Sequence, residues 1–173
     1  MKRGLAAAGL ALAVMAAAGA AQAADEEIQV YMDEMNVRGG YGLDVHTSWV
    51  PDGRLRNADY AGQMTSQDRL RITPEFSYGL TDNLELGAYL PLFTFDGHNG
   101  PEIGGVKGRL KFIAPHAEGS PVFWGANFEI GRVRHALDVN PWNAELKLIG
   151  GYRSGPWTVA TNFNIDWAVS GPD

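Results

Sequence analysis

The sequence predicts an all-β protein, an antiparallel up-and-down transmembrane β-barrel, and two observations carry this prediction. The first is the alternation in residues 157–167, where every second side chain apart from Thr161 is apolar and the others are small or polar. A period of two produces two distinct faces only in a strand. The second is that the apolar face begins and ends in tryptophan, at Trp157 and Trp167, and tryptophan favours the membrane–water boundary. Since a tilted strand crosses a bilayer in about 9–11 residues, the apolar face is expected to contact lipid and the polar face to line a barrel interior.

Composition narrows the class of protein further. The chain has 173 residues, enough for one domain, and contains no cysteine, which excludes disulfides and thiolate metal sites. The net charge is −6, and removal of Lys2 and Arg3 leaves 12 basic against 20 acidic residues, a net charge of −8. An acidic chain argues against nucleic acid as a partner.

The N-terminus has the pattern of a cleaved signal peptide. Basic Lys2 and Arg3 precede a short apolar run rich in alanine, and the sequence Ala-Gln-Ala at 21–23 provides a small-residue cleavage site. We therefore expect residues 1–23 to be a signal peptide, 24–35 a lead-in segment, and 36–173 the β-barrel.

About seven strands are expected, each with an apolar and a polar face. They are residues 36–49, 68–78, 84–92, 106–114, 122–130, 142–153 and 157–167. Pro74 lies within the second strand and indicates a bulge or a weakly paired position, because proline cannot donate to a β-ladder. The expected connections are a polar loop at 54–66, a tight turn at 81–83, a longer loop at 93–103, turns at 115–121 and 154–156, and a loop at 132–141.

These connections alternate between long and short, as in outer-membrane barrels with short periplasmic turns and longer extracellular loops. If the first strand starts in the periplasm, the aromatic residues gather at the two membrane boundaries. The predicted aromatic girdle consists of Trp49, Trp124, Trp142, Trp157 and Trp167.

An odd strand count places the C-terminal end on the outer side of the membrane. Single-chain bacterial barrels have an even number of strands, and an open sheet would leave unpaired backbone groups in lipid. We therefore expect the chain to be the N-terminal part of a larger barrel.

Several segments also carry a family resemblance. They are RITPEFSYGLTDNLELGAYLPL, GVKGRLKFIAPH, FWGANFEIGRV, WNAELKLIGGYRSGPW and NFNIDWAVSGP. In these segments the chain resembles a group of largely uncharacterised outer-membrane β-barrel proteins of Gram-negative bacteria. It is more loosely similar to porin-like proteins associated with phenol-degradation pathways. The resemblance implies the architecture and a longer chain, and brings no catalytic motif.

The polar face of the predicted barrel is charged. Its members are Arg69, Arg71, Glu75, Glu85, Lys107, Arg109, Lys111, Glu129, Glu145, Lys147 and Asp166. One interpretation is a ladder of opposite charges that neutralises the lumen and sets the strand register. The other is a basic stripe, Lys107 to Lys111, that attracts anionic solutes into a pore. Pairing across the 115–121 turn is expected to place Lys107 near Glu129 and Arg109 near Asn127.

No catalytic residue, metal site or cofactor is expected. Asp44, His46 and Ser48 share one face of the first strand, but residues two apart on a strand are about 6.6–7 Å apart, too far for the hydrogen bonds that activate a nucleophile. His98, His116 and His135 lie in loops or turns without metal-ligand spacing. Residues 96–100 lack the pattern of a calcium loop.

The sequence thus predicts a passive, porin-like channel or structural barrel of the outer membrane, with lipid and small polar or anionic solutes as partners. One alternative is a soluble periplasmic β-barrel that binds an apolar ligand inside. The other is an outer-membrane hydrolase, which would require a histidine and an acid to meet across different strands. The pore width, solute and oligomeric state have no sequence signal.

Overall fold

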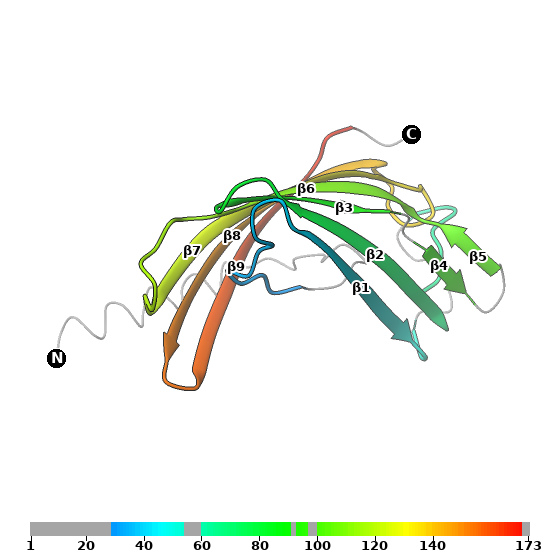
Figure 1. Cartoon of the computed structure of the whole chain (residues 1–173). Helices are drawn as coiled ribbons and strands as arrows, with labels where there is room; N and C mark the ends of the chain where they lie inside the picture. The colour runs from blue at the N-terminus through cyan, green and yellow to red at the C-terminus, as the bar shows by residue number, and fades with distance from the viewer. Residues whose placement is uncertain (1–28, 54–59, 91–92, 97–99, 171–173) are drawn as a thin grey trace, which may run out of the picture.

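A computed structural model describes residues 29–53, 60–90, 93–96 and 100–170, which form one antiparallel sheet of nine strands and no helix (Figure 1). The strands are β1 (Tyr41–Val50), β2 (Arg69–Gly79), β3 (Leu84–Tyr89), β4 (Phe93–Asp96), β5 (Gly100–Ile103), β6 (Gly105–Ile113), β7 (Val122–Val133), β8 (Trp142–Ser154) and β9 (Trp157–Ala168). The predicted all-β, antiparallel class is confirmed. The predicted signal peptide at 1–23 and the first part of the lead-in segment lie outside the described residues.

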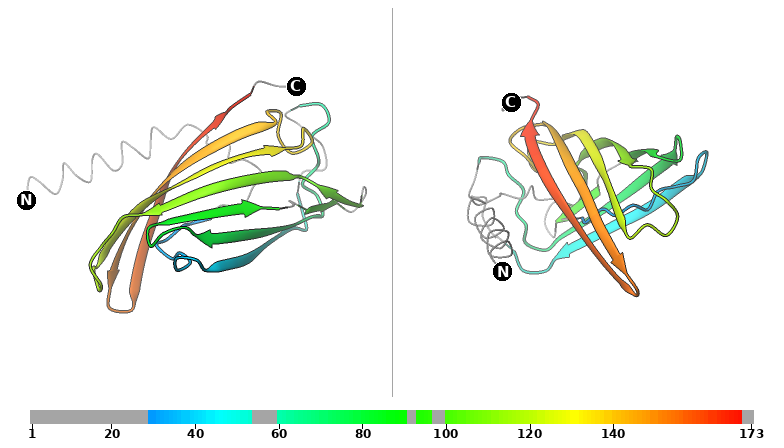
Figure 2. Two further views of the ribbon diagram at one scale, coloured as in Figure 1. Left: turned by 45° about the horizontal axis from the view of Figure 1, so that its top comes forward. Right: turned by 90° about the vertical axis from the view of Figure 1, so that its left-hand side faces the viewer.

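The main strands follow one another as a meander, and the sheet is open. β1 pairs only with β2, and β9 pairs with β8 over its whole length, from Asn143↔Ala168 to Ser154↔Trp157. The sheet curls into an arch (Figures 1 and 2), but its edge strands β1 and β9 do not meet. The described residues therefore form an open sheet and not a closed barrel, because each edge strand has one neighbour only. Closure into a larger barrel stays a prediction.

The expected loop at 93–103 is instead a hairpin formed by β4 and β5. Tyr89↔Lys107 and Phe93↔Ile103 belong to one continuous register, so β4 and β5 extend the hairpin made by β3 and β6. Pro101 fits in β5 because this short strand pairs only with β4 and lies at an edge. The prediction of a loop here, and of about seven strands, was wrong for this reason.

Pro74 marks a shift in register along β2. β2 pairs with β3 up to Glu75↔Tyr89 and with β4 from Ile72↔Phe93, so the ladder slips by one residue between them. Pro74 lies at this slip, and its carbonyl accepts a hydrogen bond of 3.1 Å from the Leu90 amide. The bulge that the proline indicated is therefore present.

The chain turns sharply before β1 and before β9. Gly39, with φ of 78°, ends an extended segment, and pairing begins at Tyr41, five residues after the predicted start of the first strand. Gly155, with φ of 58°, holds the first central position of a two-residue turn, which is the position of glycine in a type II′ hairpin. The predicted alternation of loop lengths holds only in part, because the connection 114–121 is as long as the connection 134–141.

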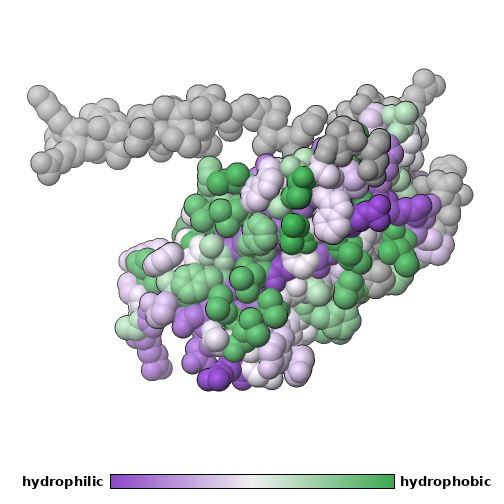
Figure 3. Space-filling view, turned by 90° about the horizontal axis from the view of Figure 1, so that it is seen from above, coloured by the Kyte–Doolittle hydropathy of each residue, from purple (hydrophilic) through white to green (hydrophobic). Residues whose placement is uncertain are grey.

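The two faces of the sheet are the reverse of those in a soluble protein. Large apolar side chains are exposed on the convex face, among them Leu43, Phe76, Leu148 and Phe163 at 58%, 49%, 46% and 62% (Figure 3). The concave face instead buries charged side chains, such as Glu75 at 2% exposure and Arg109 at 6%. Within the described residues, no helix has the length and apolarity needed to cross a membrane.

Candidate functional site: the polar concave face

The concave face carries all eleven charged residues that alternation assigned to the interior. Cross-strand pairs show the shared face, since Arg109↔Glu129, Glu129↔Glu145 and Glu145↔Asp166 follow one another across four strands. Most of these side chains are buried, although the edge residue Asp166 is exposed. The face is therefore a densely charged wall, and its chemistry depends on how the charges pair.

Arg109 on β6 is the centre of an ion cluster formed with His46, Glu75 and Glu85. Its Nε donates to Glu75, and its Nη2 lies 2.8 Å from Glu85 Oε1. His46 Nε2 lies 2.9 Å from the other Glu75 oxygen, so this carboxylate joins β1 to β6. The side chains of Arg109, Glu75 and Glu85 are 4% exposed or less. Such a buried cluster is stable only while every charge keeps its partner.

Gly87 makes this cluster possible. It lies opposite Arg109 on β3, between β6 and β2. A Cβ atom at Gly87 would lie 2.5 Å from both Cγ and Nε of Arg109, so the guanidinium reaches Glu75 only because the intervening strand has no side chain there.

Gly87→Ala is expected to lower the free energy of unfolding by about 1–3 kcal/mol, because the added methyl group displaces Arg109 from Glu75. Gly108→Ala is the matched control, since the nearest atom to a Cβ at Gly108 is 3.9 Å away, and a change within about 0.5 kcal/mol is expected. Urea titrations followed by tryptophan fluorescence measure both. Equal losses in the two variants would contradict the crossing of Arg109 over Gly87.

The most extensive contacts on this face come from a segment predicted as the lead-in segment and, at residues 36–38, as the start of the first strand. Residues 29–38, called the strap here, cross the concave side of the sheet before β1 (Figure 1). Asn162 on β9 accepts from the Tyr31 amide at 2.6 Å and donates to the Tyr31 carbonyl at 2.9 Å. A single side chain on the last strand therefore holds both backbone groups of a residue 131 positions earlier in the chain.

The Tyr31 side chain is buried, with 7% exposure, among charges. Its hydroxyl lies 2.5 Å from the Tyr89 hydroxyl and donates to Glu129 at 3.1 Å. Three cations surround its ring, with Arg109 Cζ, Lys111 Nζ and Lys147 Nζ at 5.7, 5.3 and 5.2 Å from the centroid, within the range of cation–π attraction. Burial and the nearby carboxylate of Glu129 raise the pKa of Tyr31 far above its ordinary value, so the phenol stays neutral.

Two further strap residues bind the wall. Asp33 accepts hydrogen bonds from both terminal nitrogens of Arg153 on β8, one of 2.8 Å, and His116 Nε2 lies 3.9 Å away. Asn36 binds Glu85 through its amide nitrogen and its side chain, at 2.6 and 2.8 Å, and also binds Ser77. The hydrogen bonds from Arg153 are the largest cause that lowers the pKa of Asp33 below its ordinary value of 3.8.

Acid is expected to release this part of the strap. Because the pKa of Asp33 is lowered on docking, its contribution is complete above the ordinary carboxyl pKa and is lost as the pH falls through the lowered one. Hydrogen-exchange protection factors of residues 29–38, corrected for intrinsic rates, should therefore stay constant down to about pH 5 and fall as the pH drops below the ordinary carboxyl pKa of 3.8. Asp33→Asn should remove most of this dependence. An unchanged pH dependence in that variant would assign the effect to another group.

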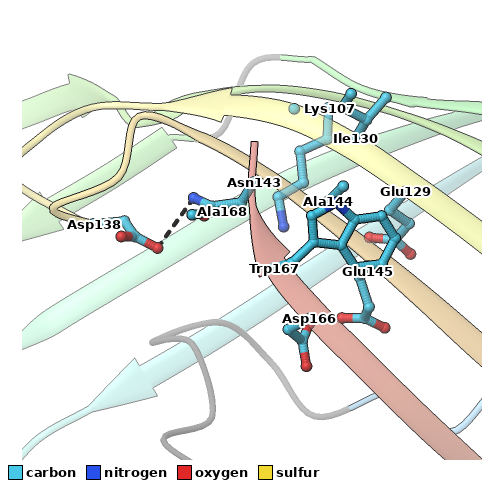
Figure 4. Close-up of a pocket in the computed structure, with 11 residues that line it drawn as sticks. Lys107, Glu129, Ile130, Asp138, Asn143, Ala144, Glu145, Asp166, Trp167 and Ala168 are labelled. Atoms are coloured by element: carbon cyan, nitrogen blue, oxygen red, sulfur yellow. Dashed lines mark hydrogen bonds between the residues drawn. The ribbon is translucent and has the colours of Figure 1, made fainter. Parts of the chain in front are cut away.

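Beside the strap, the wall leaves a hollow of about 230 Å³ (Figure 4). Three carboxylates, Glu129, Glu145 and Asp166, line it from directly opposed positions on β7, β8 and β9. Like charges in such positions repel, and neighbours offset part of this repulsion. Lys147 forms an ion pair with Glu145, and Asn127 donates to Glu129 at 2.8 Å. This hollow therefore combines carboxylates with apolar side chains such as Ile130 and Trp167.

The predicted pairing of Lys107 with Glu129 and Arg109 with Asn127 is wrong by two residues. The structure pairs Arg109 with Glu129 and Lys111 with Asn127, while Lys107 lies opposite Gly131. The ladder between β6 and β7 starts from Ile113↔Gly125, and the register depends on the geometry of the 114–121 connection, which the sequence pattern does not encode.

No family model, no curated protein and no solved structure matches this chain. The resemblance to outer-membrane proteins therefore stays a prediction from the quoted segments, and the arrangement of side chains carries the functional argument.

The five tryptophans of the predicted girdle are all exposed on the convex face. Trp49, Trp142 and Trp167 lie near one end of the strands, and Trp124 and Trp157 lie near the other end. Their distribution is that of two aromatic belts, and their contact with a membrane boundary remains a prediction.

The loop histidines do not form a metal site among the described residues. The described residues hold no group of three or more His, Asp or Glu side chains arranged for a metal ion. His116 lies beside Asp33, and His135 Nε2 lies 3.3 Å from the Ala61 carbonyl, while His98 falls outside the described residues. The contacts of Tyr31, Asp33 and Asn36 with the inner wall could not be predicted from the alternating pattern, because their partners are remote in the sequence.

Proposed function

We propose that this chain forms the wall of an outer-membrane β-barrel that passes small polar solutes. The observation that carries the proposal is the inversion of the two faces. Apolar side chains cover the convex face, while ionised side chains are buried on the concave one. In water this arrangement would expose a large apolar area that packs against nothing. In a bilayer the same apolar area lies against lipid. Lipid is therefore the partner of the convex face.

The open edges set a condition on this proposal. Unpaired amide and carbonyl groups along β1 and β9 cannot face hydrocarbon. The proposal therefore requires that further strands, from the same or another chain, pair with both edges in the membrane.

The pairing of charges on the inner wall favours a neutralised lumen over an anion-attracting stripe. Arg109 is bound to Glu75 and Glu85, and Lys147 is bound to Glu145. Lys111 donates to the Glu34 carbonyl of the strap at 2.6 Å. Because these cations are engaged, we propose a conduit for small polar solutes without strong anion selectivity.

Refolding of the purified protein in the presence of lipid vesicles tests the proposal. The protein is expected to float with the vesicles in a density gradient, and proteoliposomes should swell in isotonic solutions of small neutral sugars. A protein that stays in the aqueous fraction, monodisperse without detergent, would instead support a soluble barrel. That alternative is disfavoured because its apolar face should be concave to enclose an apolar ligand.

A hydrolase is the second candidate, because His46 and Glu75 meet across β1 and β2. A carboxylate that orients a histidine is part of nucleophilic catalytic sites. Glu75 is also bound by Arg109, which favours a structural role. Vesicle-inserted protein should therefore release no fatty acid from phospholipid, whereas a release that His46→Ala abolishes would favour the hydrolase.

A further inference from the structure

The strap crosses nearly the whole inner wall. Its side chains and backbone bind Ser77 on β2, Glu85 on β3, Lys111 on β6, Arg153 on β8 and Asn162 on β9. A segment with contacts from the second strand to the last one lies in the space that solutes would have to use.

Shape and charge both match the strap to the wall. Tyr31 joins Ile113, Phe123 and Ile149 in a buried apolar cluster, and Met32 and Met35 pack against it. Without the strap, this cluster would face the aqueous lumen. The acidic Asp33 meets Arg153, and the cations at 109, 111 and 147 surround the Tyr31 ring. The wall therefore forms a specific binding site for this segment of the chain.

Most of the contacts that hold the strap are hydrogen bonds with side chains. Asn162 binds the Tyr31 backbone and Arg153 binds Asp33. When such bonds exchange for bonds to water, the docking equilibrium changes by about a factor of five for each bond. The strap is covalently joined to β1 through Gly39 and Gly40, so release of these contacts leaves it tethered at the wall.

We propose that residues 29–38 are an internal plug that narrows the conduit and that Asn162 and Arg153 are the latches that keep it docked. This inference rests on the proposed function, since a plug can narrow a passage only if the barrel encloses a lumen. It assigns the low-permeability state to the docked strap and a wider passage to the undocked one.

The test uses the full chain in vesicles and two measurements. Hydrogen exchange reports docking of residues 29–38, and liposome swelling with neutral sugars of increasing size reports the passage. The variant Asn162→Ala with Arg153→Gln removes both latches. It removes four hydrogen bonds and should speed exchange of the strap by roughly a hundredfold or more, since each lost bond contributes about a factor of five. It should also admit larger sugars at equal inserted protein.

Matched controls change the same residue types away from the strap. Asn164→Ala alters the next polar position on the same face of β9, and Arg132→Gln alters an exposed arginine at the end of β7. Both should leave exchange and swelling unchanged. Tyr31→Ala, which keeps every wall residue, should behave as the latch variant does and covers the case in which that variant fails to fold.

The outcomes separate the plug from the proposed function. Faster exchange of the strap without a change in swelling would overturn the plug and leave the barrel intact. Unchanged exchange in both the latch variant and Tyr31→Ala would overturn the latches and the plug together. Failure of the wild-type protein to float with vesicles would overturn the proposed function, and the plug with it.

Discussion

Replacement of Arg109 by alanine is expected to lower the free energy of unfolding by about 3–5 kcal/mol, because it leaves two buried carboxylates without the cation that binds them. Glu75 and Glu85 are 2% and 4% exposed as side chains, and both are bound by Arg109. Without the guanidinium, these two anions lose their common cation on a wall that has limited access to water. Urea-induced unfolding of the vesicle-inserted or detergent-solubilised protein, followed by tryptophan fluorescence, measures the loss.

The control removes the charges together. In the triple variant Glu75→Gln, Glu85→Gln and Arg109→Met, these two carboxylates and the guanidinium are removed together, so a clearly smaller loss than that of Arg109→Ala is expected. A loss below about 1 kcal/mol for Arg109→Ala would show that the cluster is solvated like a surface ion pair. In that case the charges of the concave face would be exposed to water and not buried as the structure has them.

Leu148→Arg is expected to destabilise the membrane-inserted protein by about 2–4 kcal/mol, the effect of an arginine at the bilayer midplane. Leu148 lies in the middle of β8 on the convex face, is 46% exposed, and pairs with Ala126 and Phe163. If the convex face contacts lipid, the guanidinium must be drawn out of water or disturb the bilayer. Reversible unfolding from vesicles by urea measures the change.

Val122→Arg is the matched control, since depth in the membrane decides the effect. Val122 is exposed on the same face but is the first residue of β7, next to Pro121, so an arginine there lies near the boundary and should cost about 0–1 kcal/mol. On a face in contact with water, both substitutions would stay within about 0.5 kcal/mol. Equal small effects would therefore refute the lipid contact of the convex face.

Alternation was sufficient to assign the faces of the strands. The eleven charged residues predicted for the interior lie on the concave face, and the five tryptophans lie on the convex one. This succeeded because successive side chains of a strand point to opposite sides whatever their partners are. The bulge at Pro74 was accessible for a similar reason, since the missing amide is a local property of proline.

The strand register and the extension of β3 and β6 by the β4–β5 hairpin could not be predicted from the sequence. The β4–β5 hairpin consists of four-residue strands with a proline in one of them, a pattern too short to distinguish from a loop. The pairing of Arg109 with Glu129 in place of Asn127 depends on the 114–121 connection, whose geometry a period of two does not report.

The sequence by itself determined the alternating strands, their two faces and the polar character of the inner wall, because these follow from local periodicity and side-chain chemistry. Only the tertiary structure decided that the described sheet is open, that Arg109 crosses Gly87 to reach Glu75, and that the strap docks through Tyr31. Each of these depends on residues that are remote in the sequence, such as Tyr31 and Asn162, and contacts over such a separation arise from packing of the whole sheet rather than from any local preference.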